Sequence, residues 1–94
     1  MLDISAGEND TIVLAGRFDA AEADRARQFF LSLNDGKTVD CSRLDYISSA
    51  GLGVLLAAQK KLSERGKGLR LTGVRGHIRD VFHFSGFDQI FEIT

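Results

Sequence analysis

The chain has 94 residues, with 12 basic and 13 acidic side chains and a formal net charge of −1, which predicts one domain over residues 1–94. The near-neutral charge argues against nucleic-acid and membrane-surface binding, and no segment reaches the roughly 20 apolar residues of a membrane-spanning helix. A lone cysteine, Cys41, excludes an internal disulfide and a multi-cysteine zinc site, so we expect a cytoplasmic protein.

The first elements are predicted to be two strands. Leu2 and Ile4 alternate with polar neighbours, which is typical of a short edge strand, and Thr11–Phe18 is apolar and β-branched. The turn-like segment 7–10 lies between them. These features predict an antiparallel hairpin.

A helix is predicted to follow Asp19. Glu22 stands three residues later, in the spacing of a capping box, where each side chain accepts a hydrogen bond from a free backbone N–H. The apolar residues at helical spacing are Ala23, Ala26, Phe30 and Leu33. Residues 34–36, Asn-Asp-Gly, are expected to end the helix.

The second half of the chain alternates strands and helices. We predict a strand over Lys37–Cys41, a connection over 42–47, a helix from Ser48 or Ser49 to about Gly66, a strand over Leu69–Thr72, a helix from Ile78 to Ser85 and a closing strand over Ile90–Ile93. This order predicts an α/β fold with a mixed, mostly parallel sheet of four or five strands and about three crossover helices.

Motifs for catalysis are missing from the sequence. There is no P-loop spacing, and Gly51 and Gly53 lack the third glycine of a dinucleotide-binding motif. His77 and His83 are placed on different faces of a helix, and Cys41 has no nearby histidine. We therefore expect no enzyme, no cofactor and no metal. A nucleotide-binding module stays open as an alternative, because a glycine-flanked helix N-terminus could hold a phosphate.

The segment 48–53 (Ser-Ser-Ala-Gly-Leu-Gly) is a run of small residues before an apolar helix. Small side chains leave the helix N-terminus and its unpaired N–H groups accessible. One serine here can be an ordinary N-cap, and a serine hydroxyl can also be phosphorylated with support from the helix dipole. Spacing alone favours the cap.

Several short segments along nearly the whole chain resemble the anti-sigma-factor antagonist family, the STAS domains. They are Gly16-Arg17-Phe18-Asp19, Val39-Asp40-Cys41-Ser42, the run from Tyr46 to Leu56, and Ser85-Gly86-Phe87-Asp88 before Ile90-Phe91-Glu92-Ile93. The resemblance implies the STAS fold and a regulatory protein without catalysis of its own.

In that family the serine two residues before the first glycine of the Gly-x-Gly is phosphorylated by a partner kinase, which is itself the anti-sigma factor. The resemblance implies that Ser49 is this acceptor, that a serine phosphatase resets it, and that Asp19 lies beside it. Here Ser48 stands where the family most often has Asp, and Ala50 where it often has Ser or Thr. The implied partner-binding residues are Asp19, Ser48, Ser49, Ala50, Gly51 and Gly53.

A second function within the same fold is the STAS subunit of bacterial phospholipid-transport ABC complexes, which binds an ATPase without cycling through phosphorylation. The acceptor serine at position 49 favours the regulatory interpretation over this constitutive one. We expect no direct nucleic-acid or membrane partner, and a monomer.

Overall fold

The computed structural model describes residues 1–94. Its strands are β1 (Leu2–Ala6), β2 (Thr11–Phe18), β3 (Lys37–Ile47), β4 (Leu69–Thr72) and β5 (Glu92–Ile93), and its helices are η1 (Ala20–Glu22), α1 (Ala23–Leu31), α2 (Ser49–Ser63), α3 (Gly76–Phe84) and η2 (Phe87–Gln89). The last predicted helix therefore ends before Ser85, and the closing strand begins after Ile90.

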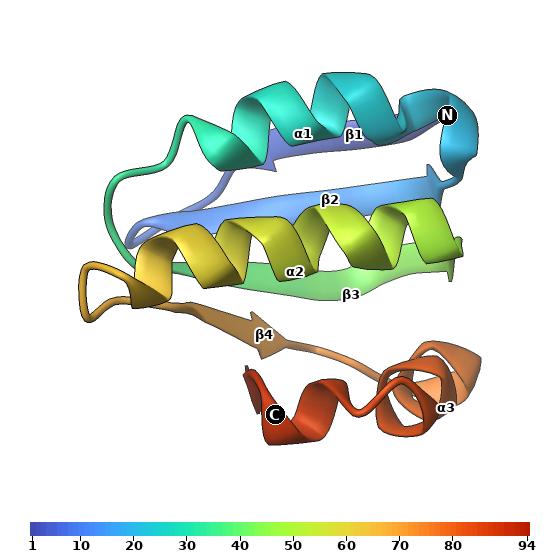
Figure 1. Cartoon of the computed structure of the whole chain (residues 1–94). Helices are drawn as coiled ribbons and strands as arrows, with labels where there is room; N and C mark the ends of the chain where they lie inside the picture. Colours follow the sequence, from blue (N-terminus) through green and yellow to red (C-terminus); the bar gives the residue numbers. More distant parts are fainter.

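The five strands form one sheet in the order β1-β2-β3-β4-β5. β1 is antiparallel to β2, as the predicted hairpin requires, and all other neighbours are parallel. Helices α1 and α2 lie side by side on one face of the sheet, and α3 lies beyond the end of β4 (Figure 1). The predicted fold class is confirmed.

A single cluster of 21 buried residues forms the core between the sheet and the helices. Alternate residues of the central strands, such as Leu14 and Val39, contribute to it from the sheet, and Val54 and Leu55 contribute from α2. Cys41 belongs to this cluster, and burial raises the pKa of its thiol to about 12. The chain has no helix that is both long and apolar enough to cross a membrane.

The prediction of a connection over residues 42–47 is wrong, because β3 continues without interruption to Ile47. Its pairing with β2 shifts register twice, between Val13 and Ala15 and between Gly16 and Arg17. Each shift places an extra β3 residue opposite β2 and reverses the in-and-out alternation that identifies a strand in a sequence. At the first shift, the Ser42 backbone N–H donates to Asp40 Oδ1 at 2.9 Å, and this bond lowers the pKa of the Asp40 carboxyl.

Candidate functional site

The ends of two neighbouring parallel strands bring Asp19 and Ser48 to the same edge of the sheet. Phe18 pairs with Ile47, and the Ser48 backbone N–H donates to the Phe18 carbonyl oxygen at 2.9 Å. Asp19 and Ser48 directly follow β2 and β3, so the pairing of these two strands holds the two residues close together. We call this edge, with Asp19 and residues 48–53, the carboxyl end of the sheet.

Ser48 is the N-cap of α2. Its Oγ accepts from the Gly51 backbone N–H at 3.1 Å, and its carbonyl oxygen accepts from the Leu52 N–H at 2.9 Å. The predicted helix start near this serine pair is confirmed. Ser49 is the first residue of the helix and is exposed, with its hydroxyl free of the capping role.

The two glycines of the Gly-x-Gly differ in the space that a side chain would have. Gly51 is buried, and a Cβ there would lie 2.9 Å from Ile47 Cγ1 and 3.0 Å from the Phe18 ring. Only a residue without a side chain allows this close approach of α2 to the strand ends. A Cβ on Gly53 would meet nothing within 4 Å. The fold therefore requires Gly51 but places no steric demand on Gly53.

The predicted capping box of Asp19 and Glu22 is wrong. The helical segment begins with the 3-10 turn η1, and Asp19 makes no side-chain capping bond. Glu22 Oε1 instead accepts from the Leu2 backbone N–H at 2.7 Å, and the Arg25 guanidinium donates to the Leu2 carbonyl oxygen. These two side chains cover the free edge of β1 at Leu2, where an unpaired strand edge needs partners.

Asp19 is left with an unusual carboxylate. Its Oδ1 is buried and has no hydrogen-bond partner within the chain. Leaving a buried acceptor unpaired costs about 1–3 kcal/mol, so such an atom in a folded protein calls for an explanation. Asp19 directly follows β2 beside the start of α2, so this unpaired oxygen belongs to the same edge as Ser49.

The start of α2 favours a negative charge. The first turn carries no acidic side chain, and the helix dipole concentrates partial positive charge on its free N–H groups. Ala50 is half-buried beside Ser49 and adds no charge. A phosphate on Ser49 would therefore meet an electrostatically favourable helix terminus.

The histidines do not form a metal site, and no group of three or more His, Cys, Asp or Glu side chains is placed to hold a metal ion. His77 and His83 are both exposed, and His83 Nδ1 lies 2.9 Å from Asp88 Oδ2.

One pair at this edge had no assigned role in the sequence. The Arg17 guanidinium carbon lies 4.2 Å from the centroid of the Tyr46 ring, and the two residues are cross-strand partners in β2 and β3. Arg17 is exposed and Tyr46 is half-buried. Pairing between strands far apart in sequence was the only signal for this contact, and it required the shifted register of β3.

A family model described as "Mlab, STAS domain" matches residues 2–93. The chain belongs to the STAS domain family. The resemblance to this family, drawn from short segments of the sequence, is confirmed.

Relatives of this STAS domain are named as anti-sigma factor antagonists. The anti-sigma-B factor antagonist of Listeria monocytogenes is 30% identical over 100 residues, covering 98% of this chain and 88% of that protein. BtrV of Bordetella bronchiseptica, named as an anti-sigma factor antagonist, is 47% identical over 56 residues, which are 60% of this chain and 48% of BtrV. That alignment therefore spans about half of BtrV.

The fold also matches a solved structure of SpoIIAA from Bacillus in its phosphorylated form, with a TM-score of 0.73 and 19% identity, over 100% of this chain and 91% of that one. At this identity the likeness shows the shared fold. The Listeria relative supports membership of the anti-sigma factor antagonist family, and the SpoIIAA structure shares its fold.

Proposed function

We propose that this STAS domain is an anti-sigma factor antagonist switched by phosphorylation of Ser49. Unphosphorylated, it binds an anti-sigma factor that is a serine kinase of the ATPase type, and so keeps that factor from its sigma factor. The observation that carries the proposal is that the two serines at the start of α2 differ in their hydrogen bonding. Ser48 makes the structural cap, and the exposed Ser49 hydroxyl has no part in it.

Phosphorylation requires an accessible hydroxyl and a place for the product charge. In the transfer, the Ser49 oxygen forms a bond to the terminal phosphorus of ATP, the bond to ADP breaks, and the hydroxyl proton leaves to a base of the kinase. The new phosphate sits at the first residue of α2, where the helix dipole supports it. Ser49 therefore combines exposure with electrostatic support.

Release of the partner follows from the charge that the phosphate adds. In the first turn of α2 the neighbours of Ser49 are uncharged, with Ala50 half-buried and Gly53 open to contact, so a partner can pack closely on this turn. A phosphate brings a charge of about −1.5 to −2. Burying that charge without a partner costs several kcal/mol, and the Asp19 carboxylate at the same edge adds a like charge.

A serine phosphatase acting on phosphorylated Ser49 then restores the binding form. This cycle takes place among cytoplasmic transcription regulators, and we place the protein there as a monomer without direct contact to nucleic acid. It needs no catalysis or cofactor from this chain.

The second candidate function is a constitutive subunit of a phospholipid-transport ABC complex. Ser48 favours it, because this residue lacks the charge that the family most often places beside the acceptor, and its hydroxyl is committed to the cap. The same open surface would then hold an ATPase permanently. Copurification with an ABC ATPase, and with no serine kinase, would establish this second function in place of the first.

The deciding experiment is intact-mass analysis after incubation with ATP and the anti-sigma factor kinase of the same organism. We expect one phosphate on the wild type and on Ser48→Ala, and none on Ser49→Ala. Ser48→Ala is the matched control, because it loses the cap, worth about 1 kcal/mol, but keeps the acceptor. A phosphate on Ser49→Ala, or an unmodified wild type, would contradict the proposal.

A further inference from the structure

We propose that Arg17, stacked on Tyr46, is a second contact for the partner and binds a carboxylate on the partner's surface. This inference rests on the proposed function and names the chemistry that the partner must present. It concerns the face of the sheet opposite the helices, next to the carboxyl end that carries Asp19 and Ser49.

The position of the pair follows from the register of the central strands. Arg17 pairs with Tyr46, and the next pair along the strands is Phe18 with Ile47. Phe18 and Ile47 are buried under α2. Because successive side chains of a strand point to opposite faces, Arg17 and Tyr46 lie on the face that the long helices leave uncovered. Their stack is therefore adjacent to the site but on its other side.

The stack holds the guanidinium ready for a ligand. The Arg17 guanidinium carbon lies 4.2 Å from the Tyr46 ring centroid, a geometry that orients the planar group over the ring face. A fixed side chain loses less conformational entropy when it binds than a free one does. Arginine and tyrosine are also the residue types that most often dominate the energetics of protein interfaces.

The donors of Arg17 are unused within the chain. None of the five ion pairs contains this residue. Arg25 and Arg70, in contrast, each pair with a glutamate of the chain. Arg17 is exposed, so its fork of N–H groups faces outward without an acceptor. A forked donor of this kind matches the two oxygens of one carboxylate.

The surrounding charge favours a protein carboxylate over a nucleic-acid backbone. Asp19 follows Arg17 closely in the chain, and the exposed Asp45 precedes Tyr46. A second exposed arginine, Arg43, is the cross-strand partner of Ala15, two residues before Arg17. With a chain net charge of −1, these two arginines among acidic neighbours would not attract a line of phosphates. One aspartate or glutamate of the partner, placed opposite Arg17 when the partner packs on Ser49, satisfies the geometry.

The test measures the affinity of the unphosphorylated protein for its anti-sigma factor kinase by calorimetry, at low and high salt. We expect Arg17→Gln to weaken binding about 10- to 100-fold. Arg17→Lys should recover little of this loss, because it keeps the charge but lacks the planar fork. Arg27→Gln, an exposed arginine on α1 outside every ion pair, is the matched control and should bind within about twofold of the wild type.

A phosphorylation assay separates this contact from the chemistry at Ser49. Arg17→Gln should raise the KM of the kinase for this substrate and leave kcat unchanged, since the acceptor serine is intact. Thermal unfolding of each variant checks that the fold is retained. Wild-type affinity in Arg17→Gln overturns this inference alone. A wild type that neither binds nor is phosphorylated overturns the proposed function and this inference with it.

Discussion

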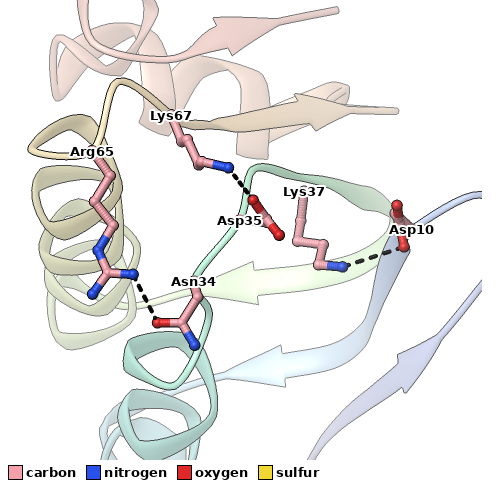
Figure 2. A network of polar contacts seen from close by, with 6 residues as sticks. All are labelled: Asp10, Asn34, Asp35, Lys37, Arg65 and Lys67. Carbon is pink, nitrogen blue, oxygen red and sulfur yellow. Dashed lines mark hydrogen bonds and ion pairs between the residues drawn. The ribbon is translucent and has the colours of Figure 1, made fainter.

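The two ends of the sheet treat their polar groups in opposite ways. At the amino end, Lys37 pairs with Asp10, Lys67 with Asp35, and the Arg65 guanidinium donates to Asn34 Oδ1 at 3.2 Å. Figure 2 shows these contacts joining the turn before β2, the connection before β3 and the connection after α2. Every charged group drawn there has a partner within the chain.

At the carboxyl end and directly next to it, three polar groups have no such partner. They are the buried Asp19 Oδ1, the stacked Arg17 guanidinium and the exposed Ser49 hydroxyl. Unpaired polar groups gain nothing for stability, and a buried one lowers it. Local departures of this kind cluster at functional sites. Under the proposed function, the amino end maintains the fold and the carboxyl end binds the partner.

The largest effect is expected from a negative charge at Ser49. Ser49→Asp should weaken binding of the partner kinase by about 3 kcal/mol or more, which is roughly 100-fold or greater, because the charge would be buried without a partner. The free energy of unfolding should stay the same or rise slightly, since an acidic residue in the first turn suits the helix dipole. Calorimetric titration and urea unfolding measure the two quantities, and binding as tight as that of the wild type would contradict the switch.

Alanine substitutions at the two glycines separate fold from binding within one turn of helix. Gly51→Ala should destabilise the protein by about 1–3 kcal/mol, because its Cβ would lie 2.9 Å from Ile47 Cγ1. Gly53→Ala should stabilise it by up to about 1 kcal/mol through helix propensity, with nothing within 4 Å to resist the methyl group. If a partner packs on this turn, Gly53→Ala should nonetheless bind it more weakly. Equal stability changes in the two variants would remove the distinction.

Most of the fold could be predicted from local sequence patterns. The hairpin, the alternation of strands and helices, and the start of α2 at the serine pair all follow from neighbouring residues, and the structure agrees with each. Family resemblance then pointed to Ser49, which spacing alone could not distinguish from a cap. The structure gives the capping bond to Ser48 and leaves the Ser49 hydroxyl out of it.

The features that the sequence did not reveal all depend on contacts between distant segments. The full length of β3 depends on two register shifts against β2. Glu22 bonds the backbone of Leu2, 20 residues away, in place of the neighbouring Asp19. Arg17 meets Tyr46 only because those shifts make them partners. Side-chain spacing within one segment contains no information about such pairs.

At the amino end, Lys61 contacts the end of α1, and its loss is expected to have a moderate effect on stability. The Lys61 ammonium donates to the Leu33 carbonyl oxygen at 3.2 Å and also to that of Leu31 at the end of α1. Lys61→Met should destabilise the protein by about 1–2 kcal/mol, because carbonyls at a helix end lose a charged donor. Lys60→Met is the exposed control and should stay within about 0.5 kcal/mol. Partner affinity should be unchanged in both, and a binding defect in Lys61→Met would extend the functional surface to this end.

The smallest effect is expected from Lys67→Met. The hydrogen bond and charge of Lys67 lower the pKa of the Asp35 carboxyl from its ordinary value of 3.8. A lowered pKa means that the pair stabilises the fold above this value, and that the contribution disappears as the pH falls through the lowered pKa. Both side chains are solvent-exposed, so the loss at neutral pH should be smaller than that of Lys61→Met and should shrink further in high salt.

Urea unfolding of the wild type, Lys67→Met, Asp35→Asn and the double variant isolates this pair as a double-mutant cycle. The two single variants should lose the same small amount, and the double variant no more than either. In acid, below the lowered pKa of Asp35, the wild type and Lys67→Met should become equally stable. A stability difference between the wild type and Lys67→Met that persists in acid would mean that Lys67 acts through packing of its aliphatic stem. The amino end would then depend on buried surface, as the core does, and its ion pairs would contribute little.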